Sequence, residues 1–187
     1  MVKFYLYEWA GLNKALFQVI NQNTPSVLIP LAWIFSNILG NYWGAPLVIF
    51  GLRVSSSLVK DNIRALTIRH QLVLFVIALG LSLTVAIVLK MFFDFPRPPA
   101  VFGHLMQGSV PADFHYSLPS GHSTYAVVVA GVLWPLVDMR LRAALVLYVI
   151  LVGWSRIATG MHFPADVVSG WVIGYSGLLI AKRLWRQ

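Results

Sequence analysis

The sequence predicts an all-α integral membrane protein, a bundle of five to six transmembrane helices with an N-terminal interfacial or membrane-inserted helix. Of the 187 residues, 58% are hydrophobic and only 11% are charged, and the mean hydropathy is +0.75. These values lie far outside the range of water-soluble domains. The absence of Cys excludes a disulfide-stapled secreted scaffold, and the low charge excludes a disordered chain.

Apolar stretches define the expected membrane spans. They run over Ser26 to Leu52, Leu72 to Leu89, Ser123 to Leu136, Ala143 to Ala158 and Val167 to Ala181. Several are shorter than the roughly 20 residues that an isolated span needs. We therefore expect protein rather than lipid to shield their ends.

The N-terminal segment, residues 1–24, has a different pattern. Between Trp9 and Gln22, apolar residues recur at helical spacing with polar residues between them: Leu12, Leu16, Val19 and Ile20 alternate with Asn13, Lys14, Gln18 and Asn21. This pattern favours an interfacial helix. A sixth, irregular span over Met1 to Ile20 is the alternative, because this stretch contains few charged residues. The N-terminal segment, residues 1–24, and the bundle over residues 25–187 are expected to form a single membrane-embedded domain, 1–187.

Most basic residues fall between or after spans, on one membrane face. They are Arg53, Lys60, Arg64, Arg69, Arg140, Arg142, Lys182, Arg183 and Arg186. The positive-inside rule makes this face cytoplasmic. No basic run is long enough to follow a nucleic-acid backbone, so we expect the bilayer and not nucleic acid as the partner. The sequence does not indicate an oligomeric state.

Three further basic residues, Lys90, Arg97 and Arg156, lie at the opposite ends of spans, where His122, His162 and Asp166 also fall. One basic residue near a span end is explained by snorkelling to head groups. Three that converge with two His and an Asp favour a functional site on the external face.

Three segments carry these residues, at 90–98, 119–122 and 155–166. They read K-x6-R-P, P-S-G-H and S-R-x5-H-x3-D. These spacings resemble the three-part signature of the type 2 phosphatidic acid phosphatase superfamily, which is shared with vanadium haloperoxidases and glucose-6-phosphatase. The resemblance covers Lys90 to Asp166 in order. It implies a helical membrane phosphatase in the inner membrane of a bacterial-type cell, acting on a lipid phosphate or pyrophosphate.

Elementary chemistry gives the same residues a role. A transferring phosphoryl group carries charge on its equatorial oxygens, which preorganised cations and N–H donors stabilise. Lys90, Arg97 and Arg156 are the expected cations, and an Arg fork can bind two phosphate oxygens at once. Ser120 and Gly121 open the third span, where free helix N-terminal N–H groups favour an anion.

His162 and Asp166 are four positions apart, with Pro164 suited to the first turn of the last helix. The carboxylate can therefore hold one ring nitrogen and leave the lone pair of the other for attack on phosphorus. His122 has no such carboxylate in its motif and is better placed as the general acid. The resemblance implies the same division: a phosphohistidine on His162, hydrolysed by water, with no metal ion and no cofactor.

Other polar residues give weaker signals. His104, Asp113 and His115 lie in the external segment Pro99 to Leu118 and could line the entrance to the site, but their spacing matches no familiar metal-ligand pattern. Asp94 could pair with Lys90 or Arg97. An anion transporter is the rival class, but it would place basic residues at several depths instead of at one face.

The lipid itself is not readable from these motifs. The resemblance permits undecaprenyl pyrophosphate, phosphatidylglycerophosphate, phosphatidic acid, diacylglycerol pyrophosphate or the lipid A 1-phosphate, and a phosphotransferase if a lipid acceptor replaces water. We favour undecaprenyl pyrophosphate, hydrolysed to undecaprenyl phosphate. A lipid carrier discharged as a pyrophosphate at the external face must lose one phosphate before reuse.

Overall fold

The structure, a computed structural model, describes residues 7–103 and 114–185, in which every regular element is a helix. The longer helices are α2 (Leu12–Asn23), α4 (Ala45–Leu58), α5 (Asn62–Phe93), α7 (Gly121–Leu133), α8 (Met139–Ala158) and α9 (Pro164–Leu184). Short helices are α3 (Ile29–Ile34), α6 (Pro98–Phe102) and the 3-10 segments Trp9–Gly11, Ser26–Leu28, Tyr42–Gly44 and Trp134–Leu136.

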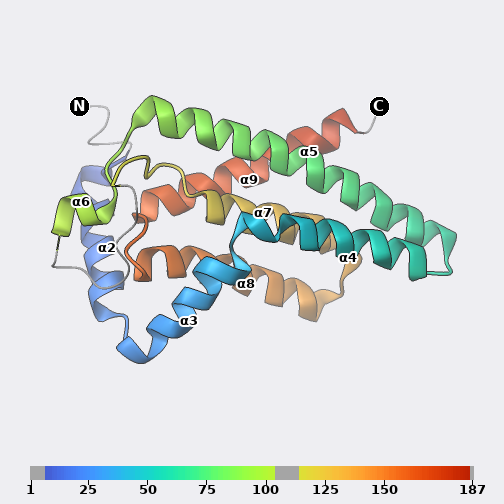
Figure 1. The fold of residues 1–187 in the computed structure, drawn as a ribbon, viewed down its shortest axis with the longest axis horizontal. Helices are drawn as coiled ribbons and strands as arrows, with labels where there is room; N and C mark the ends of the chain where they lie inside the picture. The colour runs from blue at the N-terminus through green and yellow to red at the C-terminus, as the bar shows by residue number, and fades with distance from the viewer. Residues whose placement is uncertain (1–6, 104–113, 186–187) are drawn as a thin grey trace.

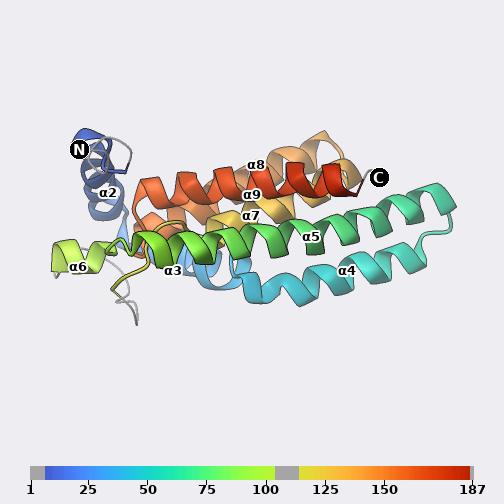
Figure 2. The ribbon, with the colours of Figure 1, turned by 90° about the horizontal axis from the view of Figure 1, so that it is seen from above.

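Helices α5, α7, α8 and α9 run along the long axis of the molecule, and α2 stands across one end of this bundle (Figures 1 and 2). Three stretches are long and apolar enough to cross a membrane: Asn62–Phe102, Met139–Ala158 and Pro164–Leu184. Many large apolar side chains remain exposed on the outside of the bundle, among them Leu47, Phe50 and Phe92. Such a surface suits lipid and not water, as the composition predicts.

The short helix α7 is shielded by protein. It has 13 residues, fewer than an isolated span needs. It packs against α5, α8 and α9, and Val128 and Val132 on its buried side have no exposed surface. The expectation that neighbouring helices protect the short spans is met here.

The single span predicted over Ser26 to Leu52 is wrong, because the chain breaks at Gly40 and Asn41. A π-helical segment, Phe35–Leu39, ends there, and α4 starts afresh at Ala45. Asn41 caps the new turn by accepting the N–H of Trp43 at 3.0 Å. At Gly40 a Cβ would lie 2.7 Å from the Phe35 carbonyl oxygen and from Val152, so the chain turns in a space that admits only glycine.

The N-terminal helix is amphipathic, as the sequence predicts, but two of its polar residues face the protein interior and two of its apolar residues face outward. Asn13, Phe17 and Asn21 form the buried stripe of α2, whereas Leu12 and Val19 are more than half exposed. The polar side chains turn inward because helix ends lie there: Asn13 accepts the Ala165 N–H at 2.9 Å, and Asn21 donates to the Ala158 carbonyl at 2.9 Å. Free backbone groups at helix termini explain this reversal.

Close contact between α7 and α9 depends on glycines. A Cβ at Gly170 would lie 2.5 Å from the Ser120 carbonyl oxygen, and one at Gly174 would lie 2.6 Å from the Thr124 carbonyl oxygen. Both obstacles are backbone atoms, which cannot rotate away. The glycines therefore fix the distance between the first turn of α7 and the second and third turns of α9.

We predict that Gly174→Ala destabilises the protein by about 1–3 kcal/mol, because the added methyl group forces α7 and α9 apart. The matched control is Gly80→Ala on α5, where a Cβ meets nothing within 4 Å. It should leave stability unchanged or raise it by up to about 1 kcal/mol. Unfolding in detergent micelles measures both, and equal effects of the two substitutions would contradict this account of the packing.

Candidate active site

The three sequence motifs meet at one end of the bundle. Helices α5 and α8 end there, α7 and α9 begin there, and α2 and α6 lie at the same end (Figures 1 and 2). The ends of these helices carry Lys90, Arg97, His122, Arg156 and Asp166. Segments far apart in the sequence are thus brought together by antiparallel packing.

His162 and Asp166 form a buried pair. The His162 Nδ1 lies 3.4 Å from the Asp166 Oδ2, and the two side chains are 3% and 0% exposed. Helix α9 begins at Pro164, so the four-residue spacing folds as the sequence predicts. The other ring nitrogen, Nε2, lies 3.5 Å from Nη1 of Arg97. A guanidinium can only donate, so the lone pair lies on Nε2 and the ring proton lies on Nδ1, toward Asp166.

Burial and nearby positive charge keep His162 neutral. Its pKa lies well below the ordinary value, first because burial disfavours the charged imidazolium, and then because Arg97, Arg156, Lys90 and His122 surround it. A neutral imidazole is the form that can act as a nucleophile.

Arg97 ties three segments together. Its Nε donates to the His115 carbonyl at 3.0 Å and its Nη1 to the Met161 carbonyl at 3.1 Å, while its backbone N–H donates to the Phe114 carbonyl at 2.7 Å. The side chain is thereby held beside His162.

Arg156 and Lys90 are also anchored within the protein. Arg156 is 4% exposed and donates from Nη1 to the hydroxyl of Ser36, while its buried Nε makes no hydrogen bond in the described part of the chain. Lys90 donates to the carbonyl oxygens of Tyr116 at 2.5 Å and Ser117 at 3.4 Å. The unused donor on Arg156 fits an anionic oxygen.

The first turn of α7 supplies backbone donors. Ser120 is the N-cap, and its hydroxyl oxygen accepts from the Ser123 hydroxyl at 3.0 Å. Its backbone N–H donates to the Asp166 carbonyl at 2.9 Å. The N–H groups of Gly121 and His122, in the first turn of α7, have no carbonyl of a preceding helical turn to bind and are the backbone donors that an anion can use. The His122 ring stands edge-on to Tyr42, with centroids 5.6 Å apart.

Sequence reasoning missed the partners of Asp166. Its Oδ1 accepts from the Tyr7 hydroxyl at 2.9 Å, and its Oδ2 accepts from the Ser117 hydroxyl at 2.6 Å and the Phe163 N–H at 2.8 Å. Tyr7 lies 159 positions from Asp166, so no local spacing could have indicated it. Ser36, the partner of Arg156, had a weak signal in the sequence, because a polar residue inside an apolar stretch needs a hydrogen-bond partner.

The external segment is described only in part. Asp94, for which the sequence allowed a pairing with Lys90 or Arg97, pairs with His115 at an Nδ1 to Oδ1 distance of 3.2 Å. Both side chains are about half exposed. His104 and Asp113 lie outside the described residues. Within residues 7–103 and 114–185, no group of three His, Cys, Asp or Glu side chains is arranged to hold a metal.

Cationic side chains surround a buried His–Asp pair at the end of a membrane helix bundle, an arrangement that suits the charge of a phosphoryl group. The chain belongs to the PAP2 superfamily, whose sequence profile matches residues 71–187. It is thus a membrane phosphatase of that superfamily, a phosphoric monoester or diphosphate hydrolase.

Relatives and solved structures agree with this assignment. The chain is 28% identical, over 88% of its length and 74% of the relative's, to an undecaprenyl-diphosphatase of Sulfolobus acidocaldarius. It is 32% identical, over 65% of its length and 61% of the relative's, to YbjG of Escherichia coli, named provisionally as an undecaprenyl-diphosphatase. The crystal structure of Aquifex aeolicus LpxE is similar, with a TM-score of 0.77, 29% identity and coverage of 92% of this chain and 95% of that one. A PAP2 type phosphatidylglycerolphosphate phosphatase from Bacillus subtilis shares the fold, with a TM-score of 0.74, 20% identity and coverage of 98% and 89%.

We predict that Tyr7→Phe lowers kcat about tenfold and leaves KM unchanged, because the Asp166 carboxylate loses a hydrogen bond that helps to orient it. Tyr148→Phe is the matched control. It removes a hydroxyl that donates to the Leu39 carbonyl at 2.9 Å, away from the site. Steady-state kinetics on both variants should separate them, and an equal loss of kcat in the two would show that the effect is general and not transmitted through Asp166.

Proposed function

We propose that residues 1–187 form one phosphatase domain that hydrolyses a lipid pyrophosphate or phosphate monoester at the external leaflet through a phosphohistidine. His162 is the nucleophile, Asp166 orients it and His122 is the general acid. Lys90, Arg97, Arg156 and the first turn of α7, from Ser120 and Gly121, bind the phosphate, and no metal ion takes part. The observation that carries this proposal is the placing of His162, with Asp166 on the Nδ1 side and Arg97 on the Nε2 side.

Phosphate binding follows from the charges. The terminal phosphoryl group takes the space beside Nε2, where Arg97 and the free Nε of Arg156 bind its oxygens. Its negative charge offsets the cations and thereby favours the protonated form of His122. Binding the substrate therefore prepares the acid for the next step.

The reaction then proceeds in two steps, and the first is transfer of the phosphoryl group to His162. The Nε2 lone pair of His162 attacks phosphorus, the bond to the bridging oxygen breaks, and His122 gives its proton to that oxygen. The dephosphorylated lipid leaves. Asp166 stabilises the positive imidazole through the Nδ1 proton.

Hydrolysis restores the enzyme. A water molecule gives its proton to His122 and attacks phosphorus, the P–N bond breaks, and inorganic phosphate departs with His162 neutral again. Protons balance over the two steps, because His122 gives one and regains one.

Undecaprenyl pyrophosphate is the substrate that we favour. Two relatives carry undecaprenyl-diphosphatase in their names, at 28% and 32% identity. A glycerolipid phosphate or the lipid A 1-phosphate is the alternative, since the similar structures of LpxE and the B. subtilis enzyme show that one fold serves differently named proteins. The phosphate site alone does not separate these lipids, because it addresses the group that they share.

The external orientation rests on charge. Basic residues at the α4–α5 loop, the start of α8 and the end of α9 lie opposite the site. Under the positive-inside rule this end faces the cytoplasm, and the site faces the periplasm or cell exterior.

For catalysis, we predict that His162→Ala abolishes turnover and that Asp166→Asn retains substrate binding while lowering kcat about 10³-fold. His122→Ala should lower kcat by about 10²–10⁴-fold. His70→Ala, at the other end of the bundle, is the control and should turn over normally. Activity lost in EDTA and regained with a divalent cation would contradict the proposed chemistry.

For orientation, we predict that Phe114→Cys reacts with an impermeant thiol reagent in intact spheroplasts and that Asn62→Cys does not. The chain has no native Cys, so each label is unique. Phe114 is 43% exposed at the site end, and Asn62 begins α5 at the opposite end. The reverse pattern of labelling would mean that the site faces the cytoplasm.

For the substrate, kcat/KM should be highest for undecaprenyl pyrophosphate when it is compared with phosphatidylglycerophosphate and phosphatidic acid in one detergent. A preference of about a hundredfold for either glycerolipid, roughly 2.7 kcal/mol in transition-state stabilisation, would overturn this choice. The phosphatase assignment would survive that result.

A further inference from the structure

A groove of about 730 Å³ lies in the half of the bundle farther from the catalytic residues. Its apolar wall is formed by α7, α8 and α9, with Ala130, Val146, Ile150 and Leu178 among the lining side chains. From Trp171 to Lys182 on α9 the groove spans twelve residues, or about 16 Å of helix. Val146 and Ile150 remain about half exposed, so the groove is open to the side. Its length and lining suit an alkyl chain that enters from the bilayer.

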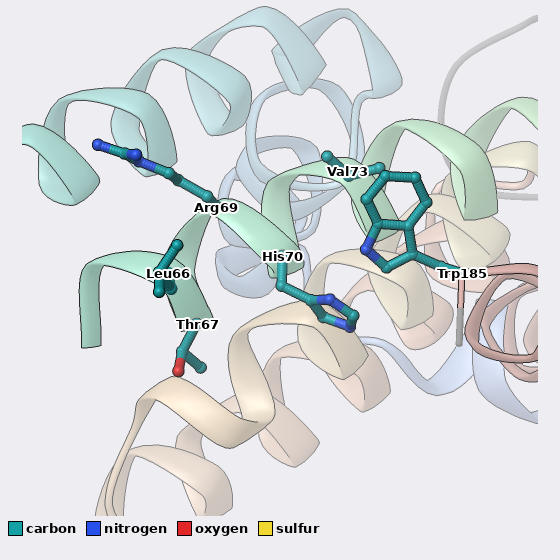
Figure 3. A pocket seen from close by; sticks show the side chains of 6 residues that line it. All are labelled: Leu66, Thr67, Arg69, His70, Val73 and Trp185. Atoms are coloured by element: carbon teal, nitrogen blue, oxygen red, sulfur yellow. The ribbon is translucent and has the colours of Figure 1, made fainter. Parts of the chain in front are cut away.

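The mouth of the groove, at the end opposite the site, is polar and cationic. His70 and Gln71 from α5, Lys182 from α9 and Trp134 lie there. The Arg142 guanidinium stacks over the Trp134 ring at 5.5 Å. Beyond His70 a second, open pocket continues along α5, in which the imidazole of His70 lies beside the indole of Trp185 (Figure 3).

The cations around this mouth have no ionic partner among the residues that the structure describes. Within residues 7–103 and 114–185, the three ion pairs all involve residues of the catalytic end: Lys14 with Glu8, His115 with Asp94, and His162 with Asp166. At the mouth end, Asp61 and Asp138 cap α5 and α8 through backbone N–H groups. Asp61 and Asp138 offset only part of the basic charge, so positive charge stays in excess at this end of the described chain and favours an anion from outside the protein.

Gln71 supplies an independent observation. It is 7% exposed, it lines the groove, and its Oε1 has no hydrogen-bond partner within the described residues. A buried acceptor without a donor costs about 1–3 kcal/mol, so a ligand that brings a hydroxyl would remove this cost. The unpaired Nε1 of Trp171, at the far end of the groove, would stay unpaired beside an alkyl chain.

We propose that this groove binds an anionic glycerophospholipid with a hydroxyl-bearing head group, of the phosphatidylglycerol class, from the leaflet opposite the catalytic site. One acyl chain lies along α7, α8 and α9. The phosphate lies by Lys182, with Arg142 and His70 nearby, and a head-group hydroxyl donates to Gln71. Basic pockets between membrane helices bind anionic lipid head groups by this combination of charge and shape.

Native mass spectrometry of the purified full-length protein tests the proposal, with phosphatidylglycerol, phosphatidylethanol and phosphatidylcholine of identical acyl chains. Phosphatidylglycerol should bind more tightly than neutral phosphatidylcholine. It should exceed phosphatidylethanol, which is anionic but has no head-group hydroxyl, by about fivefold, and Gln71→Leu should remove this difference. Equal affinity for phosphatidylglycerol and phosphatidylcholine would overturn the proposal.

Two pairs of variants locate the lipid. Lys182→Gln should weaken phosphatidylglycerol binding about fivefold, whereas Arg183→Gln, with the same change of charge outside the groove, should not. Val146→Trp should fill the groove and lower binding about tenfold, whereas Leu147→Trp, on the neighbouring lipid-facing position, should not.

Activity on a lipid phosphate confirms that each variant is folded. If Val146→Trp does not fold, the comparison of Lys182→Gln with Arg183→Gln decides whether the lipid lies in the groove. Phosphatidylglycerol binding that is unchanged in Lys182→Gln and in a folded Val146→Trp would place the lipid elsewhere and refute the proposal. Loss of a protein dimer in Val146→Trp, without loss of lipid, would assign the groove to a second copy of the chain.

Discussion

The buried carboxylate of Asp166 is the group on which the rest of the site depends. A charge with no exposed surface costs several kcal/mol unless it is paired and hydrogen-bonded. Its partners come from separate parts of the chain: the Tyr7 hydroxyl, the Ser117 hydroxyl, the Phe163 N–H and the ring of His162. Satisfying this one carboxylate therefore holds the N-terminal segment, the loop before α7 and the α8–α9 turn in a single arrangement.

The need to pair buried polar groups also explains the position of the N-terminal helix. Helix α2 is positioned by Asn13 and Asn21, which bind the backbone where α9 begins and α8 ends. Leu12 and Val19 of α2 are left exposed on the outside, whereas Asn13 and Asn21 face the protein interior beside Phe17. In a membrane, polar groups gain most by pairing inside the bundle, so the pattern that marks a surface helix in water has the opposite orientation here.

The motif residues and most span positions could be predicted from the sequence, because their signals are local. A spacing of four residues brings His162 to Asp166, and hydropathy alone finds α8 and α9. Tyr7 and Ser117 could not be found this way, since they reach the site only through tertiary packing, and Ser36 gave only a weak signal as a polar residue inside an apolar stretch. The false span over Ser26 to Leu52 has a related cause: hydropathy averages across Gly40 and Asn41, whereas the break depends on the close approach of Val152.

Trapping the covalent intermediate tests the central claim most directly. The protein is quenched in base during turnover of a lipid phosphate labelled in its terminal phosphoryl group, and the labelled peptide is sequenced by mass spectrometry. The account predicts an acid-labile phosphate on His162 during turnover of the unaltered protein, and none in His162→Ala. Label on His122, or turnover without any phosphorylated histidine, would contradict the roles assigned to the buried pair.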